Sequence, residues 1–119
     1  MKRENDKEFW GMLDEIVQKS KIVIDRPKGS RHPKYPSFQY KVDYGYLEGT
    51  SSGDGQGIDI WVGSQPEKII RSIICTVDVK KCDTDIKILY GCTEEDTTTI
   101  LATHNESAYM KGILIKREV

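Results

Sequence analysis

The sequence predicts a mainly β (α+β) fold, a small closed or nearly closed β-barrel with one helix before the strands and one helix late in the chain. Short β-branched or alternating runs fill the middle of the chain and are separated by Gly- and Pro-rich segments. Helical spacing of apolar residues occurs only near the start and before the last run. The length of 119 residues is that of one domain, so residues 1–119 are expected to form a single unit.

The first element is an amphipathic helix, expected over residues 5–19. Asn5 is a candidate N-cap, and Glu8 stands three residues further on, as in a capping box. Apolar side chains recur with helical spacing on one face at Phe9, Leu13, Ile16 and Val17. This helix is expected to lie on the core.

Seven runs then have the composition of strands, and a Pro-rich segment at 26–36 interrupts them. The runs are 21–25, 38–42, 44–50, 57–63, 69–79, 85–91 and 110–119. Before the last run, Thr93 is a candidate N-cap with Asp96 three residues on, and Asn105 is a candidate end of this second helix.

Composition and charge exclude several classes of protein. The formal net charge of −1 does not suit a nucleic-acid-binding protein, and no apolar run is long enough to cross a membrane. The charged start, MKRENDKEFW, has no apolar signal segment, so a cytoplasmic location is expected. Cys75, Cys82 and Cys92 are odd in number and form no CxxC pair, so reduced thiols are expected.

Charged residues gather in predicted turns and loops that helical or strand periodicity does not explain. They are Lys28, Arg31, His32 and Lys34 in the Pro-rich segment, Asp54 and Asp59 around a Gly-rich bend, and Asp78, Lys80, Lys81, Asp83, Asp85 and Lys87 around a later turn. Carboxylates bind hard divalent cations, and cations bind phosphate. Together they suggest a phosphate–metal complex as ligand, but composition alone favours the plainer interpretation that turns and surfaces are generally charged.

The glycines Gly53, Gly55 and Gly57 do not form a dinucleotide-binding loop. Such a loop needs a helix after the glycines, and here the strand-like run IDIWV follows. An EF-hand is excluded as well, because no glutamate stands at the required distance.

Five motifs in order carry a family resemblance. They are Asp25-Arg26-Pro27, Lys34-Tyr35, Tyr40 with Tyr44-Gly45-Tyr46, the run DGQGID from Asp54 to Asp59, and Asp85-Ile86-Lys87. Over roughly residues 21–90 the chain resembles the soluble (family I) Mg²⁺-dependent inorganic pyrophosphatases, as a short and divergent member. The resemblance implies a five-stranded, OB-like closed barrel with both helices packed outside.

The resemblance also implies an activity, hydrolysis of pyrophosphate to two phosphates with two or more Mg²⁺ ions, or Mn²⁺ in their place. The roles it implies are metal ligands at Asp54, Asp59, Asp85 and Asp78, catalytic groups at Asp59, Asp25 and Tyr44, and substrate contacts at Lys34, Lys87, Arg31 and Lys111. The residue types fit this chemistry, because metal ions and lysines neutralise a diphosphate and a tyrosine hydroxyl donates without adding charge. Assembly into a homo-oligomer is implied too.

The chain departs from the family pattern at several positions. Gln56 replaces the middle acid of the signature, Gly57 replaces its proline, and Pro36 replaces the acid after Lys34-Tyr35. The hairpin that carries a phosphate-binding arginine in the family is missing, and Arg31 is the candidate to take its place. An uncharged amide weakens a metal site, so the substrate could be another diphosphate or a nucleotide.

The alternative is a binding module that keeps the barrel and binds a phosphorylated ligand, a nucleotide or a single-stranded nucleic acid. Tyr40, Tyr44, Tyr46 and Trp61 are aromatic residues that could stack on bases. The near-neutral charge argues against nucleic acid. Trp61 is expected on the same face as Asp59, as barrel packing.

Overall fold

The computed structural model describes residues 4–53 and 55–118. In chain order the elements are α1 (Glu4–Gln18), β1 (Ile22–Arg26), β2 (Asp43–Leu47), β3 (Ile58–Val62), β4 (Ile70–Asp78), β5 (Asp83–Tyr90), α2 (Glu94–Thr103) and β6 (Met110–Lys116). The mainly β composition, the early helix and the late helix between the last two strands are confirmed. Asn5 lies inside α1 instead of capping it, whereas Thr93 and Asp96 form the expected capping box of α2.

The strands form one open sheet, so the five-stranded closed barrel is wrong. The sheet has six strands in the order β1-β2-β3-β5-β4-β6, and all neighbours are antiparallel except the parallel pair β3–β5. Closure would need β1 to pair with β6. Instead Gly112 of β6 donates its N–H to Asn105 Oδ1 at 3.2 Å and accepts from Asn105 Nδ2 at its carbonyl at 3.0 Å. These two backbone groups are therefore unavailable to another strand.

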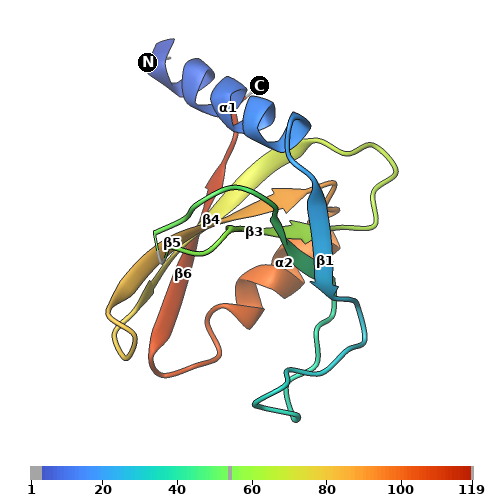
Figure 1. Cartoon of the computed structure of the whole chain (residues 1–119), viewed down its shortest axis with the longest axis vertical. Helices are drawn as coiled ribbons and strands as arrows, with labels where there is room; N and C mark the ends of the chain where they lie inside the picture. The colour runs from blue at the N-terminus through green and yellow to red at the C-terminus, as the bar shows by residue number, and fades with distance from the viewer. Residues whose placement is uncertain (1–3, 54, 119) are drawn as a thin grey trace.

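Each face of the sheet carries its own helix, as Figure 1 shows. On one face, Trp10 and Val17 of α1 pack with buried residues of the sheet such as Leu47, Ile60 and Ile73. On the other face, Ile100 of α2 packs with a second group of buried residues, which are Tyr40, Val42, Trp61, Ile74 and Leu89. Strand alternation sends neighbouring side chains to opposite faces, which is why two separate cores form.

The predicted strand at 38–42 is a loop that folds back on itself. Its backbone forms hydrogen bonds with Gly29 and Ser30, earlier in the same loop. Gly29 N–H donates to Tyr40 O at 2.7 Å, and Tyr40 N–H donates to Ser30 O at 2.9 Å. Its apolar side chains resemble those of a strand because Phe38 and Tyr40 pack on the α2 face of the sheet. Burial of these side chains therefore gives residues 38–42 the sequence pattern of a strand, although the segment does not belong to the sheet.

Gly45 lets β1 lie unusually close to β2. A Cβ atom at Gly45 would collide with the Val23 carbonyl oxygen and with Ile24 Cα. The β1–β2 register is irregular at this place, between Val23 and Arg26. The irregularity sets the direction in which the chain leaves β1, and thus where Arg26 is presented.

The sequence predicts no membrane span and reduced cysteine thiols. Within the described ranges, neither helix has the length and apolar character needed to span a bilayer. The three cysteines are unpaired thiols, of which Cys82 is exposed and Cys75 and Cys92 are half-buried.

Candidate active site

A cluster of polar side chains occupies the α2 face of the sheet where three neighbouring strands meet. Tyr44 comes from β2, Asp59 from β3, and Asp85 and Lys87 from β5. Asp59 stands directly opposite Lys87 in the parallel β3–β5 pair, and Asp85 is two residues earlier on the same side of β5. Tyr44 faces Trp61, two residues after Asp59, so all four side chains share one face.

The Lys87 ammonium is the centre of this cluster. Its Nζ atom lies 2.5 Å from Asp59 Oδ2 and 3.3 Å from Asp85 Oδ2. The Tyr44 hydroxyl is 3.5 Å from the same nitrogen. Asp59, Asp85 and Lys87 side chains are only 20%, 8% and 10% exposed, so this is a partly buried ion network rather than a surface pair.

Burial and charge act in opposite directions on Lys87. Burial lowers the pKa of the lysine, but the charges and hydrogen bonds of Asp59 and Asp85 outweigh it and leave the pKa above its usual value of 10.5. The side chain is therefore a cation at neutral pH. It balances part of the negative charge of the two acids.

Tyr44 stays a neutral hydroxyl beside these acids. Burial, the charge of Asp59 and a hydrogen bond with Asp59 raise the pKa of the phenol well above its usual value of 10. Its ring is fixed by Trp61, at 4.4 Å between ring centroids, and by Tyr40, at 5.6 Å. Tyr44 can thus donate a hydrogen bond from a defined position without adding charge.

The donor atoms fit a divalent cation only in part. Asp59 and Asp85 both reach one cation, the Lys87 ammonium, and two carboxylates completed by water and phosphate oxygens are a usual Mg²⁺ environment. Within residues 4–53 and 55–118, no group of three His, Cys, Asp or Glu residues is close enough together to hold a metal ion. Asp54, the first acid of the signature, lies outside the described residues, so its role stays a prediction.

Asp78 is used by the turn between β4 and β5. Its Oδ1 atom accepts the backbone N–H groups of Lys80 and Lys81, both at 2.9 Å. This Asx-type contact stabilises the turn. The hydrogen bonds of Asp78 are therefore made within the turn, and Asp78 is not part of the Lys87 cluster.

Asp25 stands at the end of β1 beside Arg26, at 3.5 Å between Oδ2 and Nη1. Its charge acts on Tyr40, and so does that of Asp59. Asp25 thus lies in the surroundings of Tyr40, and it makes no ion pair with Lys87.

The basic residues of the 27–42 loop have different surroundings. Arg31 donates to the Pro36 carbonyl at 3.0 Å, inside its own loop. Lys34 is exposed. Burial, followed by the charges of Arg26, Lys34 and Lys81, lowers the pKa of His32, so these three cations lie in one electrostatic neighbourhood.

Lys111 belongs to a different part of the molecule. Its Nζ atom donates to the carbonyls of Asn105 and Ser107, at 3.0 and 3.2 Å, and so closes the loop between α2 and β6. Tyr109 lies under the Lys80 ammonium, 5.0 Å from ring centroid to Nζ. The structure does not bring either residue to the Lys87 cluster.

Arg26 is a candidate site residue that sequence reasoning missed, and Tyr40, named there only as a motif and stacking residue, lies beside it. Arg26 pairs in register with Tyr44, and its guanidinium is close enough to Tyr40 to act on the pKa of that phenol. Burial raises the pKa of Tyr40, and Arg26 opposes this rise. A signal was present, because Arg26 directly follows Asp25 on a predicted strand, but only the register shows that it faces Tyr44.

Neither a comparison with models of protein families nor one with curated proteins finds a match for this chain. The resemblance to pyrophosphatases stays a prediction from the motifs.

Proposed function

We propose that this protein hydrolyses inorganic pyrophosphate, or a closely related diphosphate, to two phosphates with the help of divalent metal ions. One observation carries the proposal. Asp59, Asp85, Lys87 and Tyr44 are distant in the sequence, yet they meet at one partly buried position with both carboxylates in contact with the same cation. Buried ion networks on a sheet face are costly, and such clusters are often kept for function.

In this proposal each side chain has a distinct task. Asp59 and Asp85 hold divalent cations, and Mg²⁺ when bound neutralises the diphosphate and makes water a better nucleophile. Lys87 contacts a phosphate oxygen with its ammonium. Tyr44 donates its hydroxyl to another phosphate oxygen, which leaves the total charge of the site unchanged.

Arg26 is proposed to take the place of the arginine that the missing hairpin carries in the family. Its side chain is about one-third exposed and reaches toward Tyr40, next to Tyr44. A guanidinium binds phosphate oxygens in a bidentate manner, which a lysine cannot do. Lys34 adds charge from the exposed loop.

A specific observation supports the alternative of a binding protein without hydrolysis. Lys87 already lies between the two carboxylates, and an ammonium there competes with a metal ion. A phosphorylated small molecule is then the ligand. The nucleic-acid form of this alternative is less well supported, because Tyr40 and Trp61 are buried and pack against each other instead of presenting free ring faces.

The decisive measurement is phosphate release from pyrophosphate, with Mg²⁺ and with a chelator. We expect release that depends on Mg²⁺ and falls by at least about 10²-fold in Asp59→Asn, the loss seen when one stabilising group of a transition state is removed. The same variant should keep its fold, since asparagine has the shape of aspartate and Lys87 keeps Asp85 as its counter-ion.

The matched control is Glu15→Gln, which removes a carboxylate whose side chain is 68% exposed on α1. Its rate should equal that of the native protein. No release with Mg²⁺, Mn²⁺ or any other divalent metal, together with saturable binding of pyrophosphate, would instead establish the binding protein. Release that survives in Asp59→Asn would show that the hydrolysis comes from elsewhere.

A further inference from the structure

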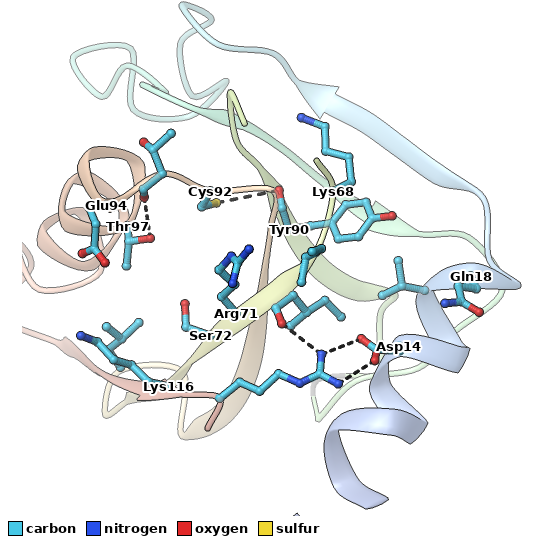
Figure 2. A pocket seen from close by; sticks show the side chains of 16 residues that line it. Asp14, Gln18, Lys68, Arg71, Ser72, Tyr90, Cys92, Glu94, Thr97 and Lys116 are labelled. Atoms are coloured by element: carbon cyan, nitrogen blue, oxygen red, sulfur yellow. Dashed lines mark hydrogen bonds and ion pairs between the residues drawn. The ribbon is translucent and has the colours of Figure 1, made fainter. Parts of the chain in front are cut away.

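A second concave site lies away from the Lys87 cluster. It is a cavity of about 670 Å³ between the end of α1, the start of β4, the end of β6 and the start of α2, and Figure 2 shows it from close by. None of Tyr44, Asp59, Asp85 or Lys87 lines it. Its volume is in the range of cavities that hold small organic ligands.

Two cations are positioned on this cavity by the strands. Arg71 lies at a register shift between Ile70 and Ser72 of β4, and irregularities of this kind redirect a side chain. Its guanidinium points into the cavity beside Ser72 (Figure 2). Lys116 of β6 stands directly opposite Ser72, on the same face of the sheet.

Ser72 supplies the independent sign of a ligand. The residue is only 6% exposed and lines the cavity. Within the described part of the chain, its hydroxyl makes no hydrogen bond, yet it is not sealed off from the cavity. Because this hydroxyl has no protein partner, remains open to the cavity and lies between two cations, it can donate to an acceptor bound there.

We propose that this cavity binds an oxyanion of the phosphate type, with Arg71, Lys116 and the Ser72 hydroxyl as its donors. Two cations and one neutral donor match the charge and the oxygen atoms of a phosphate group better than those of a neutral ligand. The other two cations of the cavity are engaged. Arg117 pairs with Asp14 at 2.8 Å, and Lys68 donates to the carbonyls of Gly63 and Gln65.

Two acids act on the proposed donors. Glu67 lies 3.6 Å from Arg71, but both side chains are more than half exposed, so this pair is weak and can open. Glu94 lines the cavity from the first turn of α2 and lies above Lys116 in the view of Figure 2. Its charge should reduce the affinity for an anion, so its removal has a predictable effect of opposite sign.

The size of the cavity extends the proposal to the source of the phosphate. Val17, Ile70, Leu114 and the Tyr90 ring give the cavity apolar walls beside the donors. Free orthophosphate would leave these walls bare. A phosphate monoester with an apolar body would cover them.

The test is a ¹H–¹⁵N NMR titration of the metal-free Asp59→Asn protein with orthophosphate and, separately, with phenyl phosphate. This background keeps the result independent of the proposed hydrolysis. We expect saturable shifts of the backbone amides of Arg71, Ser72 and Lys116. Tighter binding of phenyl phosphate identifies a monoester as the natural class, and equal binding identifies the free ion.

Three variants then assign the contacts. Arg71→Gln and Ser72→Ala should each weaken binding, Arg71→Gln by about tenfold, the loss of one charge-assisted hydrogen bond. Glu94→Gln should tighten it. Lys19→Gln, at an exposed lysine of the segment after α1, is the control and should change nothing.

The proposal is overturned if neither phosphate compound shifts the amides of the cavity in a saturable way. It is overturned equally if Arg71→Gln and Lys19→Gln have the same effect, since the attraction would then be that of net charge alone. Arg71 is exposed, so its replacement should not disturb folding, and the comparison stays interpretable.

Discussion

At the scale of single residues, Lys87 decides how two buried acids can coexist. Asp59 and Asp85 are mostly buried on neighbouring strands, and their charges would repel each other without a cation. The lysine therefore has two possible uses, one as an internal counter-ion and one as a phosphate contact. A divalent ion between the carboxylates would free it for the second.

Replacing Lys87 with methionine separates these uses. The variant loses the ammonium and keeps a side chain of similar length, so the acids lose their counter-ion. Loss of one partner from a buried ion pair costs about 3 kcal/mol of unfolding free energy. Urea unfolding should show this loss, and added Mg²⁺ should restore more stability to the variant than to the native protein.

The control for this prediction is Lys19→Met, because the Lys19 side chain is 68% exposed and paired only with Glu15. Its stability should stay within about 0.5 kcal/mol of native. A Lys87→Met protein that gains nothing from Mg²⁺ would argue against a divalent site formed by Asp59 and Asp85.

His104 is a second residue whose protonation is set by its surroundings. Trp61 Nε1 donates to His104 Nε2 at 3.0 Å, and both residues are buried under α2. Burial, assisted by the charge of Lys87, lowers the pKa of His104 from 6.5 to about 4. The folded protein thus holds a neutral imidazole that accepts the Trp61 hydrogen bond.

This lowered pKa predicts a pH dependence of stability. Between pH 6.5 and pH 4 the unfolded chain binds a proton at His104 and the folded chain does not, so stability falls as the pH falls. The contribution is about 3 kcal/mol, since one pKa unit equals about 1.4 kcal/mol. Unfolding free energies of native protein and His104→Gln should converge at the acidic end of this range.

Glutamine can still accept the Trp61 hydrogen bond but does not titrate, so carboxylate effects cancel in the comparison. Parallel pH profiles of the two proteins would show that His104 does not contribute.

At the scale of elements, the close approach of β1 to β2 places Arg26 and Asp25. β1 has five residues, and its register with β2 shifts between Val23 and Arg26. Only a glycine at position 45 leaves room for the Val23 carbonyl and Ile24 Cα. The approach thus depends on one missing side chain.

Gly45→Ala should therefore loosen β1 specifically. The added Cβ overlaps backbone atoms, which cannot rotate away as a side chain can. We expect a loss of about 1–3 kcal/mol, the usual cost of overpacking. Hydrogen exchange should become faster at the amides of β1 and stay unchanged in β4.

Gly11→Ala is the contrasting control, because a Cβ at Gly11 meets nothing within 4 Å. In a helix this change should stabilise, by up to about 1 kcal/mol. Equal effects of the two substitutions would contradict the steric argument.

At the scale of the whole molecule, the open sheet needs a helix on each face. α1 covers one face through Trp10 and Val17, and Arg117 near the end of the chain holds it by an ion pair with Asp14. α2 and the 27–42 loop cover the other face, which carries the candidate site (Figure 1). The two cores share the strands but no side chains.

Trp10→Ala tests how much the fold depends on α1. Trp10 is 7% exposed, and replacing a buried Trp with Ala costs about 3–5 kcal/mol. Urea unfolding followed by circular dichroism should show this loss. Met12→Ala, at a side chain 66% exposed on the same helix, should have little effect. A stability of Trp10→Ala close to native would mean that the sheet folds without α1.

Much of the local structure follows from the sequence, and so do the residues of the candidate site. The cap at Thr93, both helices and six of the seven strand runs depend on neighbouring residues, whose spacing is visible in the chain. Asp59, Asp85, Lys87 and Tyr44 were identified by their motifs. The 38–42 run was misread because packing of Phe38 and Tyr40 gives a loop the pattern of a strand.

The sequence by itself determined most of the helices and strands and which side chains have the chemistry expected of metal and phosphate ligands, because backbone preferences and side-chain chemistry act over a few residues. The tertiary structure alone decided that β3 lies beside β5, that the sheet stays open, and that Arg26 faces Tyr44. Strand order and register depend on contacts between distant segments, and periodicity within a strand is the same for an open sheet and a closed barrel.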